Sequence, residues 1–215
     1  MMEANTSILP VFLLMLFSSF EFCTGYSALE DARIIAEYKL HLRNTDHAQV
    51  ARKLVHQANW ASVGSISTNE KITDYPMVNI ISIDDSDLDG TSTGRIHFLL
   101  TDLDFTGPDW QHINKVTFLF TDDQNLNCKK RGEDPMEPTC ARTMISGKVE
   151  KLDTNSVNYK TWLEAFKSRH PAAKNWLKAH NFYLCELQIE NIFVLDYYGG
   201  PHDVAVKDYY NAKPN

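Results

Sequence analysis

Short β-rich runs separated by turn residues fill most of the sequence after Trp60, and they constrain the fold more than any other feature. Valine, isoleucine, threonine and aromatic residues are concentrated in these runs, as is typical of strands. The runs lie at 61–67, 76–83, 95–100, 115–121, 142–149, 182–189 and 192–197. The first five follow one another with only turns and loops between them, which disfavours a βαβ alternation. The sequence therefore predicts an α+β fold built around a mostly antiparallel β-barrel.

Three segments are predicted to be helices that flank this barrel. The first begins at Asp46, which together with Gln49 resembles a capping box. Apolar residues then recur at helical spacing, at Val50, Ala51, Leu54, Val55 and Ala58. The other two predicted helices cover 155–168 and 171–178.

An apolar run near the N-terminus has the length of a signal-peptide core. Residues 8–22 form this run, interrupted by Glu21, and the small residues Thr24 and Gly25 follow. The run is too short to span a bilayer comfortably. The usual positive charges before it are missing, and an uncleaved anchor is the alternative. We predict a signal peptide at 1–25, an N-terminal arm at 26–44 and one domain at 45–215, so that the mature chain is secreted without a membrane span.

The charge balance argues against a general affinity for nucleic acid. The chain has 28 acidic and 21 basic residues and a formal net charge of −7. Such a field repels phosphate backbones, and the longest basic run is only Lys129-Lys130-Arg131. We expect no nucleic-acid partner. An intracellular transcription factor would conflict with this charge and with the apolar leader.

Signal cleavage would leave three cysteines in an oxidising compartment, because Cys23 would be removed. Cys128 and Cys140 bracket a segment rich in turn residues, and closing a loop of this size stabilises a chain by about 3 kcal/mol. We predict a disulfide between them. Cys185 lies where apolar and polar residues alternate, which indicates a buried thiol in a strand. Pairing of this thiol between chains stays open.

Motifs for metal binding and catalysis are incomplete or missing. The run from Asp85 to Gly90 matches the first six positions of a calcium loop, but Ile96 occupies the position that needs a bidentate glutamate. An acidic loop between strands explains this run better. Three histidines cluster only loosely along the chain, at His170, His180 and His202. The sequence contains no nucleophile elbow, zinc-protease, dinucleotide-binding or Walker motif. It therefore predicts no catalytic residue, metal ligand or cofactor-binding residue.

Several motifs resemble, in order and in spacing, those of the CREG family. These are secreted glycoproteins named as cellular repressors of genes stimulated by an adenoviral oncoprotein. The resemblance covers about residues 45–211. The motifs that carry it are Asn127 to Pro135 and on to Cys140, Ser146-Gly147, Arg169-His170-Pro171 with Trp176, Val194-Leu195-Asp196-Tyr197-Tyr198-Gly199-Gly200-Pro201, and Tyr209-Tyr210-Asn211.

The resemblance implies the fold of the FMN-binding split barrels of pyridoxamine phosphate oxidases, which are homodimers that hold flavin at the subunit interface. The CREG family itself is regarded as lacking the flavin and as having no established catalytic activity. A flavin phosphate needs Arg or Lys donors, which oxidases of this fold place on the strand corresponding to 77–83 and just after the next strand. Here residues 77–83 carry no cation, and Asp102 and Asp104 follow the next strand. We expect no cofactor; an FMN-dependent oxidoreductase with a small pocket lined by Trp110 and Tyr197 is the alternative.

The predicted function is binding. We call the segment closed by the predicted disulfide, residues 128–140, the excursion. This excursion and the turn at 199–200 are expected to shape a dimer interface and the mouth of a pocket. The candidate residues of this pocket and interface are Trp110, Asp196, Tyr197, Tyr198, Gly199 and Gly200. We expect a non-catalytic homodimer that acts through protein partners, such as a cell-surface or sorting receptor, in the control of cell growth and differentiation.

The sequence constrains the final compartment of the protein less than it constrains the fold. Members of the CREG family carry N-glycans and are linked to lysosomal delivery. The only glycosylation sequon in this chain is Asn5-Thr6-Ser7, inside the predicted signal peptide. We expect secretion, with an endosome or lysosome as the alternative compartment, and glycan-dependent sorting is disfavoured.

Overall fold

The computed structural model describes residues 29–37, 39–40 and 45–214. These residues separate into two compact units that divide after Thr45. In the first unit, residues 29–37 and 39–40 are helical. The predicted signal peptide and part of the predicted N-terminal arm lie outside the described residues. Within the described part of the chain, no helix is long and apolar enough to cross a membrane.

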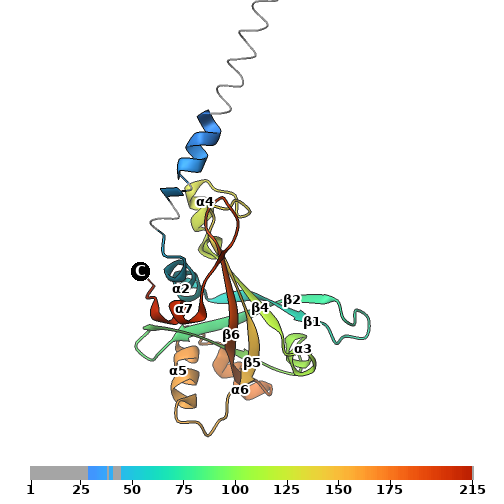
Figure 1. Ribbon diagram of the computed structural model, residues 1–215. Helices are drawn as coiled ribbons and strands as arrows, with labels where there is room; N and C mark the ends of the chain where they lie inside the picture. The colour runs from blue at the N-terminus through green and yellow to red at the C-terminus, as the bar shows by residue number, and fades with distance from the viewer. Residues whose placement is uncertain (1–28, 38, 41–44, 215) are drawn as a thin grey trace, which may run out of the picture. The chain divides into compact units, whose positions relative to one another are not determined.

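The second unit is built on one antiparallel sheet that closes on itself (Figure 1). Its strands are β1 (Trp60–Ile66), β2 (Pro76–Ser86), β3 (Ser92–Leu100), β4 (Val116–Thr121), β5 (Arg142–Lys151), β6 (Tyr183–Leu195) and β7 (His202–Asp203). They are ordered β3-β2-β1-β4-β5-β6-β7, and a further pairing between β3 and β6 closes the first six into a barrel. The predicted α+β fold with a mostly antiparallel barrel is confirmed.

Helices lie on the outside of this barrel. They are α2 (His47–Gln57), α3 (Thr106–His112), α4 (Asn127–Arg131), α5 (Tyr159–Arg169), α6 (Ala173–Ala179) and α7 (Val206–Asn211), with a 3₁₀ turn at Asp122–Asn125. The predicted helix start at Asp46 is confirmed, because its Oδ1 accepts a hydrogen bond from the backbone N–H of Gln49 at 3.1 Å. The α2 and α7 helices lie side by side (Figure 1).

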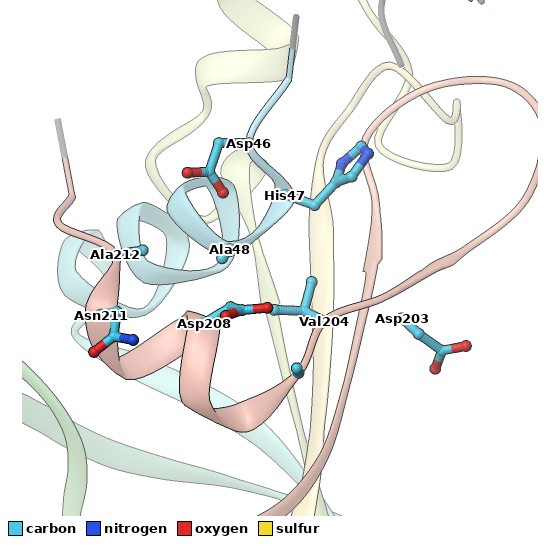
Figure 2. A pocket seen from close by; sticks show the side chains of 9 residues that line it. Asp46, His47, Ala48, Asp203, Val204, Asp208, Asn211 and Ala212 are labelled. Carbon is cyan, nitrogen blue, oxygen red and sulfur yellow. The ribbon is translucent and has the colours of Figure 1, made fainter. Parts of the chain in front are cut away.

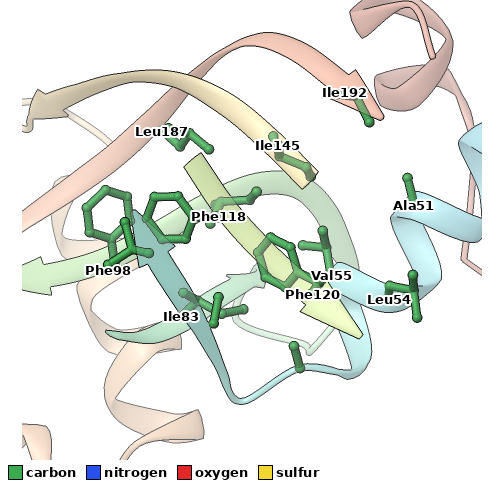
Figure 3. Packing of buried hydrophobic residues seen from close by; sticks show 14 of the residues in the cluster. Ala51, Leu54, Val55, Ile83, Phe98, Phe118, Phe120, Ile145, Leu187 and Ile192 are labelled. Carbon is green, nitrogen blue, oxygen red and sulfur yellow. The ribbon is translucent and has the colours of Figure 1, made fainter. Parts of the chain in front are cut away.

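The main hydrophobic core fills the barrel beneath α2 (Figure 3). The α2 helix contributes Ala51, Leu54 and Val55, which recur at the spacing of one helix face. Aromatic rings from β3 and β4 occupy the centre, and the centroids of Phe98 and Phe118 lie 5.1 Å apart. Alternate residues along β4 are buried, as expected for a strand with one face toward the core.

The last two predicted strands are in fact one long strand, and this prediction was wrong. On β5, Ser146 pairs with Asn191 and Gly147 pairs with Ile189, so that Glu190 is an extra residue in β6 and forms a bulge. A Cβ atom on Gly147 would lie 2.1 Å from the carbonyl oxygen of Gln188. Glycine is therefore required at this close approach of the two backbones.

The start of the second predicted helix was also wrong. The α5 helix begins at Tyr159 rather than at residue 155. The preceding residues form turns around Asp153, which accepts hydrogen bonds from the backbone N–H of Asn155 on its side chain and of Ser156 on its carbonyl oxygen. Val157, counted among the apolar residues of this helix, is 94% exposed in the turn.

The cysteines lie as predicted. Cys128 and Cys140 form a disulfide, with their Cα atoms 5.5 Å apart, and both are buried. Cys185 is a free thiol buried in β6. Burial raises the pKa of this thiol far above its ordinary value, which keeps it protonated and excludes a role as a nucleophile at neutral pH.

Candidate functional site

A row of side chains crosses the outer face of the barrel. Most of these side chains are apolar, although this face is turned toward solvent. The strand register sets Ile80, Ser62, Leu119, Met144 and Phe193 directly opposite one another on five neighbouring strands. Residues opposite one another in antiparallel strands share a face. Val78, two residues before Ile80, lies on the same face of β2, and these two side chains are 69% and 63% exposed. Exposed apolar surface of this kind marks an interaction site.

Next to this row the face is hollowed by small residues. Gly64, Thr117 and Ser146 pair across β1, β4 and β5, and they line a cavity of about 450 Å³. The hydroxyls of Thr117 and Ser146 are 2.9 Å apart. Lys115 and Glu190 also line this cavity, and Glu190 forms an ion pair with Lys148 at 3.0 Å. The outer face thus combines exposed apolar side chains with a hollow.

Two smaller cavities lie near the end of β3, beside the segments in which the resemblance led us to look for phosphate donors. Their volumes are about 270 and 250 Å³, and Asp104 lines both of them. One carboxylate oxygen of Asp104 accepts a hydrogen bond from the side-chain amide of Asn79 at 2.7 Å. Asp102 and Asp109 line the second cavity. Among the described residues that line these two cavities there is no lysine or arginine, and three carboxylates would repel a phosphate dianion. The residues present do not fit FMN.

The candidate residues predicted from the sequence divide between two ends of the barrel. The Nε1–H of Trp110 in α3 donates to the hydroxyl of Tyr183, at the start of β6, over 3.2 Å. Tyr197 follows the other end of β6. A strand of 13 residues is roughly 40 Å long, so Trp110 and Tyr197 of one chain do not line a common pocket.

The other candidate residues lie at one end together with the disulfide. Arg142, the first residue of β5, pairs with Thr121 at the end of β4 and with Leu195 at the end of β6. The disulfide-closed excursion and the turn from 196 to 201 therefore extend from the same end of the barrel (Figure 1). In that turn Gly199 and Gly200 have φ of 114° and 101°, values that favour glycine.

Tyrosines in the C-terminal part of the chain differ in exposure. Tyr198 is 46% exposed, and its ring meets that of Tyr197 edge-on with centroids 5.4 Å apart. Tyr209 is instead fully buried, and its hydroxyl donates to the carbonyl oxygen of Gly94 at 3.0 Å. Tyr209 therefore has a structural role, whereas Tyr198 is available to a partner.

A buried polar network was missed by the sequence analysis. Its centre is Arg169, whose Nε lies 2.9 Å from a carboxylate oxygen of Asp84. The same guanidinium donates to Ser86 Oγ and lies 3.7 Å from the carboxylate of Asp85. Asp85 also accepts from Ser92 and lies 2.8 Å from His56 Nδ1. Asp85 is thus buried and held by partners within the protein, whereas Asp87 is half-buried and Asp89 is exposed. With Ile96 in place of the bidentate glutamate, the run lacks the ligand set of a calcium loop.

Two histidines and an aspartate converge at the end of the barrel that carries the glycine turn. His47 Nδ1 lies 3.0 Å from Asp196 Oδ2, and the rings of His47 and His202 stack with centroids 4.0 Å apart. Only His202 belongs to the loose histidine cluster noted in the sequence. His170 is instead held by the carbonyl oxygen of Ile83, 2.7 Å from its Nε2. His47 was missed, because it lies 149 residues from Asp196 and only the fold brings them together.

The closed antiparallel barrel with flanking helices defines this protein as a split-barrel protein. Solved structures with this fold include a heme binding protein from Mycobacterium smegmatis, with a TM-score of 0.60 and 15% identity, covering 80% of this chain and 62% of that protein. ChuZ from Campylobacter jejuni is similar with a TM-score of 0.55 and 10% identity, covering 75% of this chain and 62% of that protein. At such identities these likenesses concern the fold alone.

Sequence comparison gives the family within this class. Residues 42–211 match the model of the CREG β-barrel. Human protein CREG1 is 35% identical over 167 residues, which cover 78% of this chain and 74% of the relative. Mouse protein CREG1 is 34% identical over the same shares of the two chains. The chain belongs to the CREG family.

Proposed function

We propose that this CREG-family protein is a secreted, cofactor-free homodimer that acts through protein partners in the control of cell growth and differentiation. The observation that carries this proposal is the exposed apolar row on the outer face of the barrel. Residence in an endosome or lysosome is the alternative compartment within the same proposal. The growth control implied by the resemblance to the CREG family supplies the biological setting, and the exposed apolar row supports the proposal that the barrel binds partners.

The outer face supports a homodimer. Val78, Ile80 and Leu119 are exposed on the side of the sheet opposite to the core. A second copy related by twofold symmetry would cover this row with the same row of its own. The hollow beside the row offers space for side chains of the partner.

The acidic lining near Asp104 supports binding rather than flavin chemistry. Three aspartates raise the electrostatic cost of placing a phosphate dianion there. The names of the relatives, CREG1 and CREG2, designate no enzymatic activity. The buried and protonated Cys185 offers no substitute nucleophile.

The disulfide supports passage through the secretory pathway. Disulfides persist in oxidising compartments and are rare in the cytosol of most cells. The Cys128–Cys140 bond therefore agrees with the predicted signal peptide. The exposed Tyr198 and the disulfide-closed excursion lie at one end of the barrel, and we assign the contact with a protein partner to this end.

The homodimer is tested by sedimentation of the mature chain and of an Ile80→Lys variant. A lysine at this position sets two like charges into a twofold interface, so we expect dimerisation to weaken at least about tenfold. The unchanged protein should sediment as a dimer.

Leu88→Lys provides the matched control. Leu88 is 62% exposed, almost the same as Ile80, but it lies in the turn between β2 and β3 rather than on the outer face. This variant should remain dimeric. A monomeric unchanged protein, or equal weakening by both substitutions, would contradict the assigned interface.

A further inference from the structure

We propose that His47, Asp196 and His202 form a binding site for a divalent transition-metal ion such as Zn²⁺. The ligand atoms of these three side chains all lie within 4.8 Å of one another, and they are the one group of this kind in the described part of the chain. Asp196 is buried, whereas both histidines are partly exposed. A metal ion can therefore reach the site from solvent while one of its ligands is fixed inside.

Three separate elements bring these ligands together. His47 is the first residue of α2, Asp196 directly follows β6, and His202 begins β7. The turn with Gly199 and Gly200 reverses the chain so that His202 pairs with Val194 on β6. Rigid elements on both sides thus hold the ligands, which is the arrangement that metal sites need.

The chemistry of the ligand set selects the class of metal. Two imidazoles and one carboxylate suit zinc and other first-row transition metals, and three protein ligands leave further positions for water. Calcium and magnesium prefer sets made of oxygen ligands, which this site does not provide. With metal–ligand bonds of 2.0–2.1 Å, the ligand atoms of a tetrahedral zinc ion lie roughly 3.3 Å apart. His47 Nδ1 and Asp196 Oδ2, at 3.0 Å, are already near this separation.

The surroundings favour a cation. A cavity of about 420 Å³ adjoins the site, and His47, Asp46, Asp203 and Asp208 line it. Figure 2 shows the imidazole of His47 turned away from the carboxylate of Asp46. The positive end of the α2 dipole, equivalent to about half a charge, opposes a cation here. The negative charges of Asp196 and of the carboxylates that line the cavity are together larger than this half positive charge.

Metal binding requires a local rearrangement. The rings of His47 and His202 are stacked with an angle of 9° between their planes. A bound ion lies close to the plane of each imidazole that coordinates it, and two stacked, nearly parallel rings with centroids 4.0 Å apart cannot both point a nitrogen at one ion lying in their planes. At least one ring must rotate, so the metal replaces the stacked pair rather than adding to it.

The test is a titration of the untagged mature chain, first freed of metal by a chelator, with Zn²⁺. Calorimetry should give one Zn²⁺ per chain, and the melting temperature should rise with Zn²⁺ because the ion binds the folded state. His202→Ala and Asp196→Asn should each weaken binding at least about tenfold. Asp196→Asn keeps the shape of the side chain and so separates lost coordination from lost folding.

His112→Ala is the matched control, since His112 is an exposed histidine at the end of α3, outside the cluster. It should leave both the stoichiometry and the affinity unchanged. The proposal is overturned if Zn²⁺ shows no saturable binding, if the ligand variants bind it as well as the unchanged protein, or if Mg²⁺ competes at equal concentration.

Discussion

Arg169 connects three parts of the chain that are distant in sequence. Its guanidinium forms an ion pair with Asp84 in β2 and donates to the backbone carbonyl oxygens of His56 and Ala58, where α2 ends. Its side chain is 17% exposed, and that of Asp84 is fully buried. The arginine therefore neutralises a buried carboxylate and also satisfies carbonyl groups that a helix end leaves without partners.

We predict that Arg169→Ala lowers the free energy of unfolding by about 3–5 kcal/mol, because the carboxylate of Asp84 would stay buried without its counter-ion. Urea denaturation measures this loss. Lys148→Ala is the control, because Lys148 pairs with Glu190 at the surface with more than half of each side chain exposed; it should cost less than about 1 kcal/mol. Equal losses in the two variants would rule out the buried pair as a major contribution.

The sequence did not indicate these contacts of Arg169. Asp84 and Asp85 resemble an acidic run before a loop, and nothing in their spacing reveals Arg169, which lies 85 and 84 positions further along the chain. The same holds for His47 and Asp196, which are joined only through the closure of the barrel. Pairs of this kind depend on tertiary contacts that a local pattern does not encode.

At the scale of elements, the excursion between β4 and β5 depends on its disulfide. The segment from Cys128 to Cys140 contains only the short helix α4, which is too short to be stable alone. The disulfide closes it with a separation of 12 residues. Arg131 adds ion pairs to Asp122 and Glu133, and these are partly exposed and contribute less.

Cys128→Ser should therefore lower the free energy of unfolding by about 2–4 kcal/mol. The measurement is thermal or urea unfolding under oxidising conditions. Cys140→Ser and the double variant should give the same loss, since each breaks the same bond. A reductant should lower the stability of the unchanged protein to that of the variants, and an unchanged melting temperature in Cys128→Ser would argue against the bond.

Strong periodic elements were predictable, and short or irregular ones mostly were not. The exception is the seven-residue helix α6 (Ala173–Ala179), which overlaps the helix predicted at 171–178. The α2 helix has a side-chain cap and a repeated apolar face, and both are visible in the sequence. The helices α3 and α7 have seven and six residues, too few for a repeated face. The bulge at Glu190 looked like a break between two strands, because its polar residues interrupt the alternation.

At the scale of the whole molecule, the sequence predicted the barrel but not the surfaces that its closure creates. The β-rich runs indicated β1 to β6, with β6 divided into two, but not the short β7. The pairing of β3 with β6 that closes the barrel follows from no local pattern. The exposed row through Ile80 and Leu119 became visible only once the strand register was known. The division of Trp110 and Tyr197 between the two ends of β6 likewise required the fold.

We propose that this split barrel binds protein partners and has no flavin. The most direct test is to purify the mature chain from Tyr26 without added cofactor, record its absorbance, and titrate it with FMN while following the flavin fluorescence. We predict no copurified flavin and no saturable quenching, because the cavities near Asp104 carry carboxylates where a phosphate would bind. A saturable signal at one flavin per subunit would contradict the account and make an FMN-dependent oxidoreductase the better assignment.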